Sequence, residues 1–174
     1  MQDVEPSRVY RLFYPQVPLI VASAHKGVVS AMPVVSAISL SSNPPLIGFS
    51  SSTSHSTYST LIASRFFSLS WLDRKYVGAV ARLGNHVPKD VNDKLRWAGL
   101  GHHIDNELDI PVIDDAIAVL ECSLFSTQGI GDHDLIVGEV KSASASDDYK
   151  DYWQFKNYHP ILYTGSEGGF RTLD

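Results

Sequence analysis

The chain has 174 residues, of which 44% are hydrophobic and 19% are charged, and its formal net charge at pH 7 is −5. This length is enough for one domain with a substantial core, and we expect a single domain over residues 1–174. The acidic balance argues against a general nucleic-acid binder, because such proteins normally present a basic face.

Cysteine use and hydropathy indicate the compartment. Cys122 is the only cysteine, so no disulfide can form within one chain, and a reducing, cytoplasmic setting is expected. Residues 1–21 contain early acids, a proline and only a short apolar run, which fits neither a signal peptide nor a spanning helix. Residues 27–64 form the longest uncharged stretch but are too rich in Ser and Pro to cross a membrane, so no membrane partner is expected.

The first third of the chain alternates extended runs with turn signals. Residues 17–24 are apolar and β-branched, a turn follows at 25–27, and a second extended run continues from Val28. Pro33 inside that run indicates an edge strand or a bulge. After a break at 43–45, residues 46–50 form a third strand.

Short helices and further strands follow. The spacing of Tyr58, Leu61 and Ile62 predicts a short amphipathic helix, which Ser54 or Ser56 could cap. Residues 65–72 alternate as a strand. Two helices are expected next, one after Asp73 that ends at Gly84–Asn85 and a short one at 90–97. Strands follow at 118–127 and after the turn at 131–132, and residues 147–158 are expected to form a surface excursion. This β-rich pattern with short inserted helices favours a closed or nearly closed antiparallel barrel.

A cluster of hydroxyl groups lies where the strand ending near Ser50 leads into the predicted helix at Tyr58. Free backbone N–H groups at a helix start, together with the helix dipole, favour an anion. Hydroxyls add adjustable donors, but residues 50–58 contain no Lys or Arg. The alternative is a Ser-rich loop beside a capped helix.

Other candidates are weaker on their residues alone. His133 stands at a tight turn before a strand, where it could donate to a ligand or shuttle a proton, or simply bond to backbone. The run 101–109 holds two histidines and three acids, but no second ligand cluster accompanies it, so no metal site is expected. Cys122 is expected to be a buried, inert thiol. The glycines of 165–170 open no predicted helix and do not form a dinucleotide fingerprint.

Several of these blocks occur in one order that resembles a known family. They are "PVVSAISLSSNPPLIGFS", the hydroxyl cluster, "DIPVIDDAIAVLECSL", "GDHDLIVGEV" and "PILYTGSEGGFRTL". Together they resemble the flavin reductase-like, FMN-binding split-barrel proteins over about residues 14–173. The most specific parts are Ser41–Leu46 and Gly131–Leu135.

The resemblance implies a mainly β fold, a six-stranded antiparallel Greek-key split β-barrel with short inserted helices, that works as a homodimer. It implies an FMN site in which one block runs along the isoalloxazine ring, a second approaches the ribityl chain, and a third approaches the phosphate. The residues implied are Pro33, Val34, Val35 and Ser36 for the ring, Ser50, Ser51 and Ser52 for the ribityl chain and phosphate, and His55, Thr57 and Tyr58 for the phosphate. His133 is implied to lie near the flavin and the nicotinamide, as a catalytic residue.

The activity implied is an NAD(P)H-dependent flavin reductase, in which NADH or NADPH passes hydride to flavin N5 and reduced flavin serves an acceptor, such as a monooxygenase component. FAD could take the place of FMN. Two alternatives stay open at this point: a flavin-binding electron carrier without nicotinamide activity, and a barrel that binds no flavin and acts through protein contacts.

Overall fold

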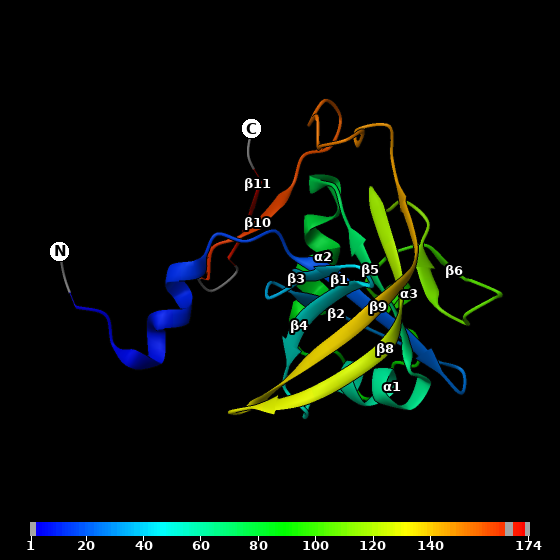
Figure 1. The fold of residues 1–174 in the computed structure, drawn as a ribbon, viewed down its shortest axis with the longest axis horizontal. Coiled ribbons are helices and arrows are strands. Elements are labelled where there is room, and N and C mark those ends of the chain that lie inside the picture. Colours follow the sequence, from blue (N-terminus) through cyan, green and yellow to red (C-terminus); the bar gives the residue numbers. More distant parts are fainter. Residues whose placement is uncertain (1–2, 166–168, 173–174) are drawn as a thin grey trace.

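The computed structural model describes residues 3–165 and 169–172. Within these residues the main antiparallel sheet has seven strands, in the order β2-β1-β5-β8-β9-β4-β3 (Figure 1). Its strands are β1 (Leu19–His25), β2 (Val28–Val34), β3 (Ile38–Ser42), β4 (Pro45–Ser51), β5 (Phe66–Trp71), β8 (Ala118–Ile130) and β9 (His133–Ala145).

Short elements surround this sheet. The pairs β6 (His102–Ile104) with β7 (Pro111–Ile113), and β10 (Ile161–Tyr163) with β11 (Phe170–Thr172), form two small sheets. The helical elements are the 3-10 segments η1 (Pro6–Phe13) and η2 (Arg74–Tyr76) and the helices α1 (Ser56–Ser64), α2 (Val77–Gly84) and α3 (Lys94–Trp97). Figure 1 shows η1 to one side, away from the main sheet.

The main sheet curls around one apolar core, as the predicted split barrel requires. Its inward residues come from six strands, and α1 contributes Leu61 to the same core. Phe49 and Phe67 are fully buried there, with ring centroids 5.6 Å apart in an edge-to-face arrangement. The mainly β, antiparallel fold predicted from the sequence is confirmed. The seventh strand arises because the run after Val28 is broken at residues 35–37, which separates β3 from β2.

A second apolar core covers the outer face of β1. Leu19 and Val21 face the inner core, whereas Ile20 and Ala22 face this second core, to which α2, α3 and β7 contribute. Burial on both faces explains why residues 17–24 read as a continuous apolar run rather than an alternating one.

Three local predictions meet different outcomes. Pro33 does lie on an edge strand, because β2 ends the sheet order. The N-cap of α1 is His55, not Ser54 or Ser56, since the His55 carbonyl already accepts from Ser59 N–H while its backbone is extended. Asp73 caps η2 rather than one continuous helix, accepting from Lys75 N–H at 3.0 Å.

The helix predicted over 90–97 is shorter in the structure. The N–H of Val29 donates to the carbonyl of Asn92 at 2.8 Å, and Val29 pairs with Asp93, so this part of the chain runs beside β2. The helix α3 therefore begins only at Lys94, after Asp93 caps it by accepting from Arg96 N–H.

The aromatic excursion after Asp147 is organised by a buried carboxylate. Asp148 is only 4% exposed and accepts from the backbone N–H groups of Lys156, Asn157 and Tyr158. Burial opposes ionisation of Asp148, but these N–H donors outweigh it and lower its pKa.

The predicted glycine-rich tail lies partly outside the described residues, at 166–168. In the part of the chain that the structure describes, no helix is long and apolar enough to cross a membrane.

Gly138 on β9 allows the sheet to close tightly over the core. A Cβ at this position would overlap the ring of Phe67 and lie 3.2 Å from Cys122 Cβ. Because Phe67 is fully buried, Gly138→Ala should lower the free energy of unfolding by about 1–3 kcal/mol. Urea unfolding measures this. Gly129→Ala is the control, since its Cβ would meet only Asp134 Oδ1 at 3.7 Å; equal stabilities for the two variants would contradict the packing argument.

Candidate functional site

A cleft of about 720 Å³ opens between the edge strand β2, the start of α1, and the loop after α2. Residues from the β10–β11 region and Tyr14 close its opposite side. Its volume lies within the range of small-molecule and cofactor sites, about 300–1,000 Å³.

One wall of the cleft is apolar and partly aromatic. Pro33 and Val35 line it at the end of β2, whereas the side chain of Val34 turns into the inner core and is 6% exposed. Facing this strand are Tyr14 and Tyr163, whose ring centroids lie 4.9 Å apart. A flat, largely apolar group could therefore lie between the strand edge and the aromatic side, with Val34 offering only its backbone.

The opposite end of the cleft is polar and begins at α1. The first-turn N–H groups of a helix have no partner within the helix, and within the described residues no side chain caps α1. Lys94 lies at the same place, because its Nζ donates to Ser56 Oγ at 2.6 Å. Among the described residues that line the cleft, two are lysines, two are histidines and none is acidic. In a chain with a net charge of −5, this composition favours an anionic ligand.

Lys94 is the residue that sequence reasoning missed. It lies 38 residues from Ser56 in the chain, so no local pattern connects the two. Its place is fixed by Asp93, which caps α3, pairs with Val29 of β2, and lies 3.5 Å from Nε2 of the buried His102. Burial lowers the pKa of Lys94. The available signal was the Asp93-Lys94 pair, which lies inside the helix predicted over 90–97 and at the start of the observed α3.

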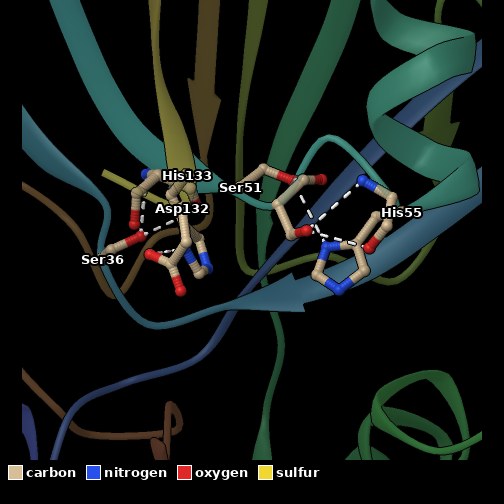
Figure 2. A network of polar contacts seen from close by, with 8 residues as sticks. Ser36, Ser51, His55, Asp132 and His133 are labelled. Carbon is tan, nitrogen blue, oxygen red and sulfur yellow. Dashed lines mark hydrogen bonds and ion pairs between the residues drawn. The ribbon is translucent and has the colours of Figure 1, made fainter. Parts of the chain in front are cut away.

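His55 is held as a largely neutral side chain. Burial lowers its pKa, and the nearby charges of His133 and Lys94 lower it further. The Ser51 hydroxyl lies 3.3 Å from His55 Nδ1, and both residues belong to the polar network in Figure 2. The cation at this end of the cleft is therefore Lys94, and His55 acts mainly through hydrogen bonds.

The hydroxyls of Ser36, Ser51 and Ser52 have partners within the site, mostly nearby backbone groups. Ser50 N–H donates to Ser36 Oγ at 3.0 Å, and the hydroxyls of Ser52 and Ser54 lie 2.9 Å apart. The structure thus brings Ser36 and Ser50 together beside the end of β2, and Ser51 and Ser52 together at the approach to α1.

The two residues at the start of α1 have structural partners. Thr57 is 1% exposed and its hydroxyl lies 3.0 Å from that of Ser30, which joins α1 to β2. The Tyr58 hydroxyl donates to Asp134 at 2.5 Å, and this bond raises the pKa of Tyr58.

The structure brings only some of the predicted residues to the cleft. Those that line it are Pro33, Val35, His55 and Thr57. Those that do not line it directly are Val34, Ser36, Ser50, Ser51, Ser52, Tyr58 and His133.

His133 begins β9 at the same end of the sheet. Asp134 pairs with Ser51 of β4, which places His133 next to the end of that strand. Its Nδ1 lies 2.8 Å from Asp132 Oδ1, and its side chain is 42% exposed. Figure 2 shows the contact between the His133 and Asp132 side chains, together with Ser36, Ser51 and His55. One ring nitrogen of the imidazole is therefore already engaged, at the strand end that leads toward α1.

Two other candidates are accounted for. In the described residues, no group of three or more His, Cys, Asp or Glu side chains is arranged to hold a metal ion. Cys122 is fully buried, and burial raises its pKa to about 12, so its thiol is inert.

Comparison with known proteins identifies the family. Residues 10–166 match the family model described as a flavin reductase like domain. The chain therefore belongs to the flavin reductase-like family, as its resemblance indicated. A crystal structure of an FMN-binding protein from Thermus thermophilus, with bound p-hydroxybenzaldehyde, superposes with a TM-score of 0.82 at 28% identity, covering 99% of this chain and 93% of that one.

Three relatives extend this comparison. An uncharacterized protein from Aeropyrum pernix is 31% identical over 95% of this chain, which spans 63% of that protein's length. A flavin reductase from Pseudomonas putida is 26% identical over a segment that covers 84% of this chain and 78% of that protein's length. The reductase subunit of a flavin-dependent monooxygenase from Mycobacterium tuberculosis is 27% identical over a segment that covers 72% of this chain and 63% of that protein's length.

The lowered pKa of His55 gives a prediction for stability. The unfolded pKa is about 6.5 and the folded pKa is lower, so the folded state binds fewer protons. The contribution of neutral His55 is present above pH 6.5 and is lost as the pH falls through the folded pKa. Between pH 7.5 and 5, the native chain should lose more stability than His55→Gln. Urea midpoints across this range test the claim, and parallel pH curves for the two proteins would contradict it.

Proposed function

We propose that this chain binds FMN in the cleft and catalyses its reduction by NADH or NADPH. The observation that carries the proposal is the cleft itself. An apolar strand edge leads to a helix start without a side-chain cap, beside which lies the half-buried Lys94. None of the described lining residues is acidic. These are the two environments that a flavin ring and a phosphate need.

The residues fit such a cofactor in three parts. Pro33 and Val35 line the cleft, and with the backbone of their neighbours Val34 and Ser36 they would offer a surface for the tricyclic ring. Ser50, Ser51 and Ser52 provide hydroxyl and backbone partners near a ribityl chain. The α1 start would hold the phosphate through His55, the backbone N–H groups of Thr57 and Tyr58, and Lys94.

The bound flavin would supply the hydride chemistry, taking hydride at N5 from a nicotinamide donor and passing electrons onward. The chain's own residues orient the reactants. Lys94 and the first-turn N–H groups fix the phosphate end, so that the ring is held against β2. The Asp132 contact orients the His133 imidazole, leaving Nε2 free to bond to the nicotinamide amide or to the ring edge. The backbone N–H groups near Val35 and Ser36 would stabilise negative charge on the ring.

The proposal includes partners. The chain would act as one domain within a homodimer and deliver reduced flavin to an acceptor, such as a monooxygenase component. The M. tuberculosis relative, which is named as the reductase subunit of such an enzyme, supports the acceptor. Support for the dimer comes from η1, which has no buried residue and exposes Leu12 (67%) and Phe13 (70%). An apolar face of this kind is typical of a protein contact.

Flavin binding and reduction can be tested separately. Fluorescence quenching measures the FMN dissociation constant, and the loss of NADH or NADPH absorbance with added FMN measures reduction. Binding with no oxidation of either donor would favour an electron carrier over a reductase. No quenching, and no rise in the unfolding temperature with FMN, would overturn the flavin site itself.

Lys94→Ala should weaken FMN binding about tenfold to a hundredfold, because the variant loses a charged partner of the phosphate. Riboflavin, which lacks the phosphate, should bind both proteins equally. The control Lys150→Ala removes the same charge from an exposed loop residue that does not line the cleft. If Lys94→Ala weakened riboflavin as much as FMN, the assignment of Lys94 to the phosphate would be wrong.

His133→Ala should lower the rate of NAD(P)H oxidation by about a hundredfold, while the FMN dissociation constant stays within about twofold. Stopped-flow measurement of flavin reduction separates the two effects. His103→Ala is a matched control, because His103 makes an equivalent 2.8 Å contact with Asp114 but lies on β6, in a separate sheet from β4 and β9. A His133→Ala protein with the full rate of hydride transfer would refute the role of His133.

A further inference from the structure

The cleft contains a second pair of basic side chains that the proposed FMN site does not use. His86 and Lys89 lie in the loop between α2 and α3, and both are exposed on the cleft lining. Within the described part of the chain, neither has an ion-pair partner. Two basic groups without a carboxylate partner, in an acidic protein, remain available to an anion.

The loop that carries this pair is held in place at both ends. At its start, Asn85 N–H donates to the carbonyl of Arg82 at 3.1 Å, and at its end Val29 N–H donates to the carbonyl of Asn92 at 2.8 Å. Gly84 also lies against β2, since a Cβ there would be 3.3 Å from Pro33 Cγ. The loop therefore leaves α2 directly beside the strand proposed to support the flavin ring.

One phosphate is already assigned to α1 and Lys94, so the second basic pair has no role in binding FMN alone. FAD, NADH and NADPH each carry at least one phosphate more than FMN, on the side of the adenosine. We propose that His86 and Lys89 form a second anion subsite, which binds this additional phosphate of an adenosine dinucleotide. The inference rests on the proposed flavin cleft and assigns residues to the adenosine side of a dinucleotide, which the proposed function leaves unassigned.

The subsite can be tested without turnover. Isothermal titration calorimetry of the native chain, Lys89→Ala and Lys89→Arg would use three probes: FMN, ADP and 2′,5′-ADP. ADP stands for the diphosphate that FAD, NADH and NADPH share, and 2′,5′-ADP for the 2′-phosphorylated adenosine that only NADPH carries. Lys89→Ala should weaken at least one adenosine probe about fivefold, leave FMN within about twofold, and be rescued by Lys89→Arg.

The probe that weakens identifies the source of the phosphate. Loss of ADP binding indicates that the subsite binds the diphosphate that FAD, NADH and NADPH share, and selective loss of 2′,5′-ADP binding indicates the 2′-phosphate of NADPH. Lys150→Ala, which removes a charge outside the cleft, should leave the dissociation constants of all three probes unchanged. If Lys150→Ala weakened the adenosine probes as much as Lys89→Ala did, the effect would come from net charge alone, and the subsite would be overturned.

Failure of the subsite differs from failure of the flavin site. Native protein that bound FMN but neither adenosine probe, or a Lys89→Ala variant that bound both probes normally, would overturn the subsite and leave the proposed function standing. A Lys89→Ala variant that lost FMN as strongly as the probes would also overturn it, because Lys89 would then serve the flavin phosphate. Adenosine probes that bound where FMN did not would instead overturn the proposed function.

Discussion

The candidate site depends on the meeting of Lys94 with the start of α1. A helix start attracts anions through its free N–H groups and dipole, but in water this attraction is modest. Lys94 adds a full charge at the same point, held by its 2.6 Å contact with Ser56. Without that contact the hydroxyl-rich segment would have only His55, whose pKa is lowered by burial, and the end of the cleft would be nearly neutral.

The cores decide where Lys94 lies. β1 contributes alternate residues to two apolar cores, one inside the curled sheet with α1 and one outside it with α2 and α3. The walls of the cleft come from elements of both cores, so β1 and its neighbour β2 set their spacing. A substitution that loosened the α3 packing would therefore move the lysine without touching the strand edge.

The sequence predicted the parts of the site that depend on near neighbours. The apolar runs, the turn before His133 and the hydroxyl cluster are local patterns, and the structure contains each of them. It did not predict Lys94 at Ser56, because that contact depends on α3 running beside β2. The resemblance placed Val34 along the ring surface. Alternation along β2 turns its side chain into the core, so only its backbone is available there. The break after Val34 was missed since residues 28–42 are uniformly apolar or small and give no strong turn signal.

The hydroxyl network has a consequence for any ligand. Ser36 bonds to the backbone of Ser50, and Ser51 lies within reach of His55. Hydroxyls that are already paired cost less entropy to hold in place when a ligand arrives, but each can give a new bond only with its remaining lone pair or by rotation. Such a network orients a ligand more than it attracts one. The attraction must then come from charge, so the affinity depends mainly on Lys94 and the first turn of α1. For the same reason, the absence of acids from the described cleft lining is as important as any single hydrogen bond.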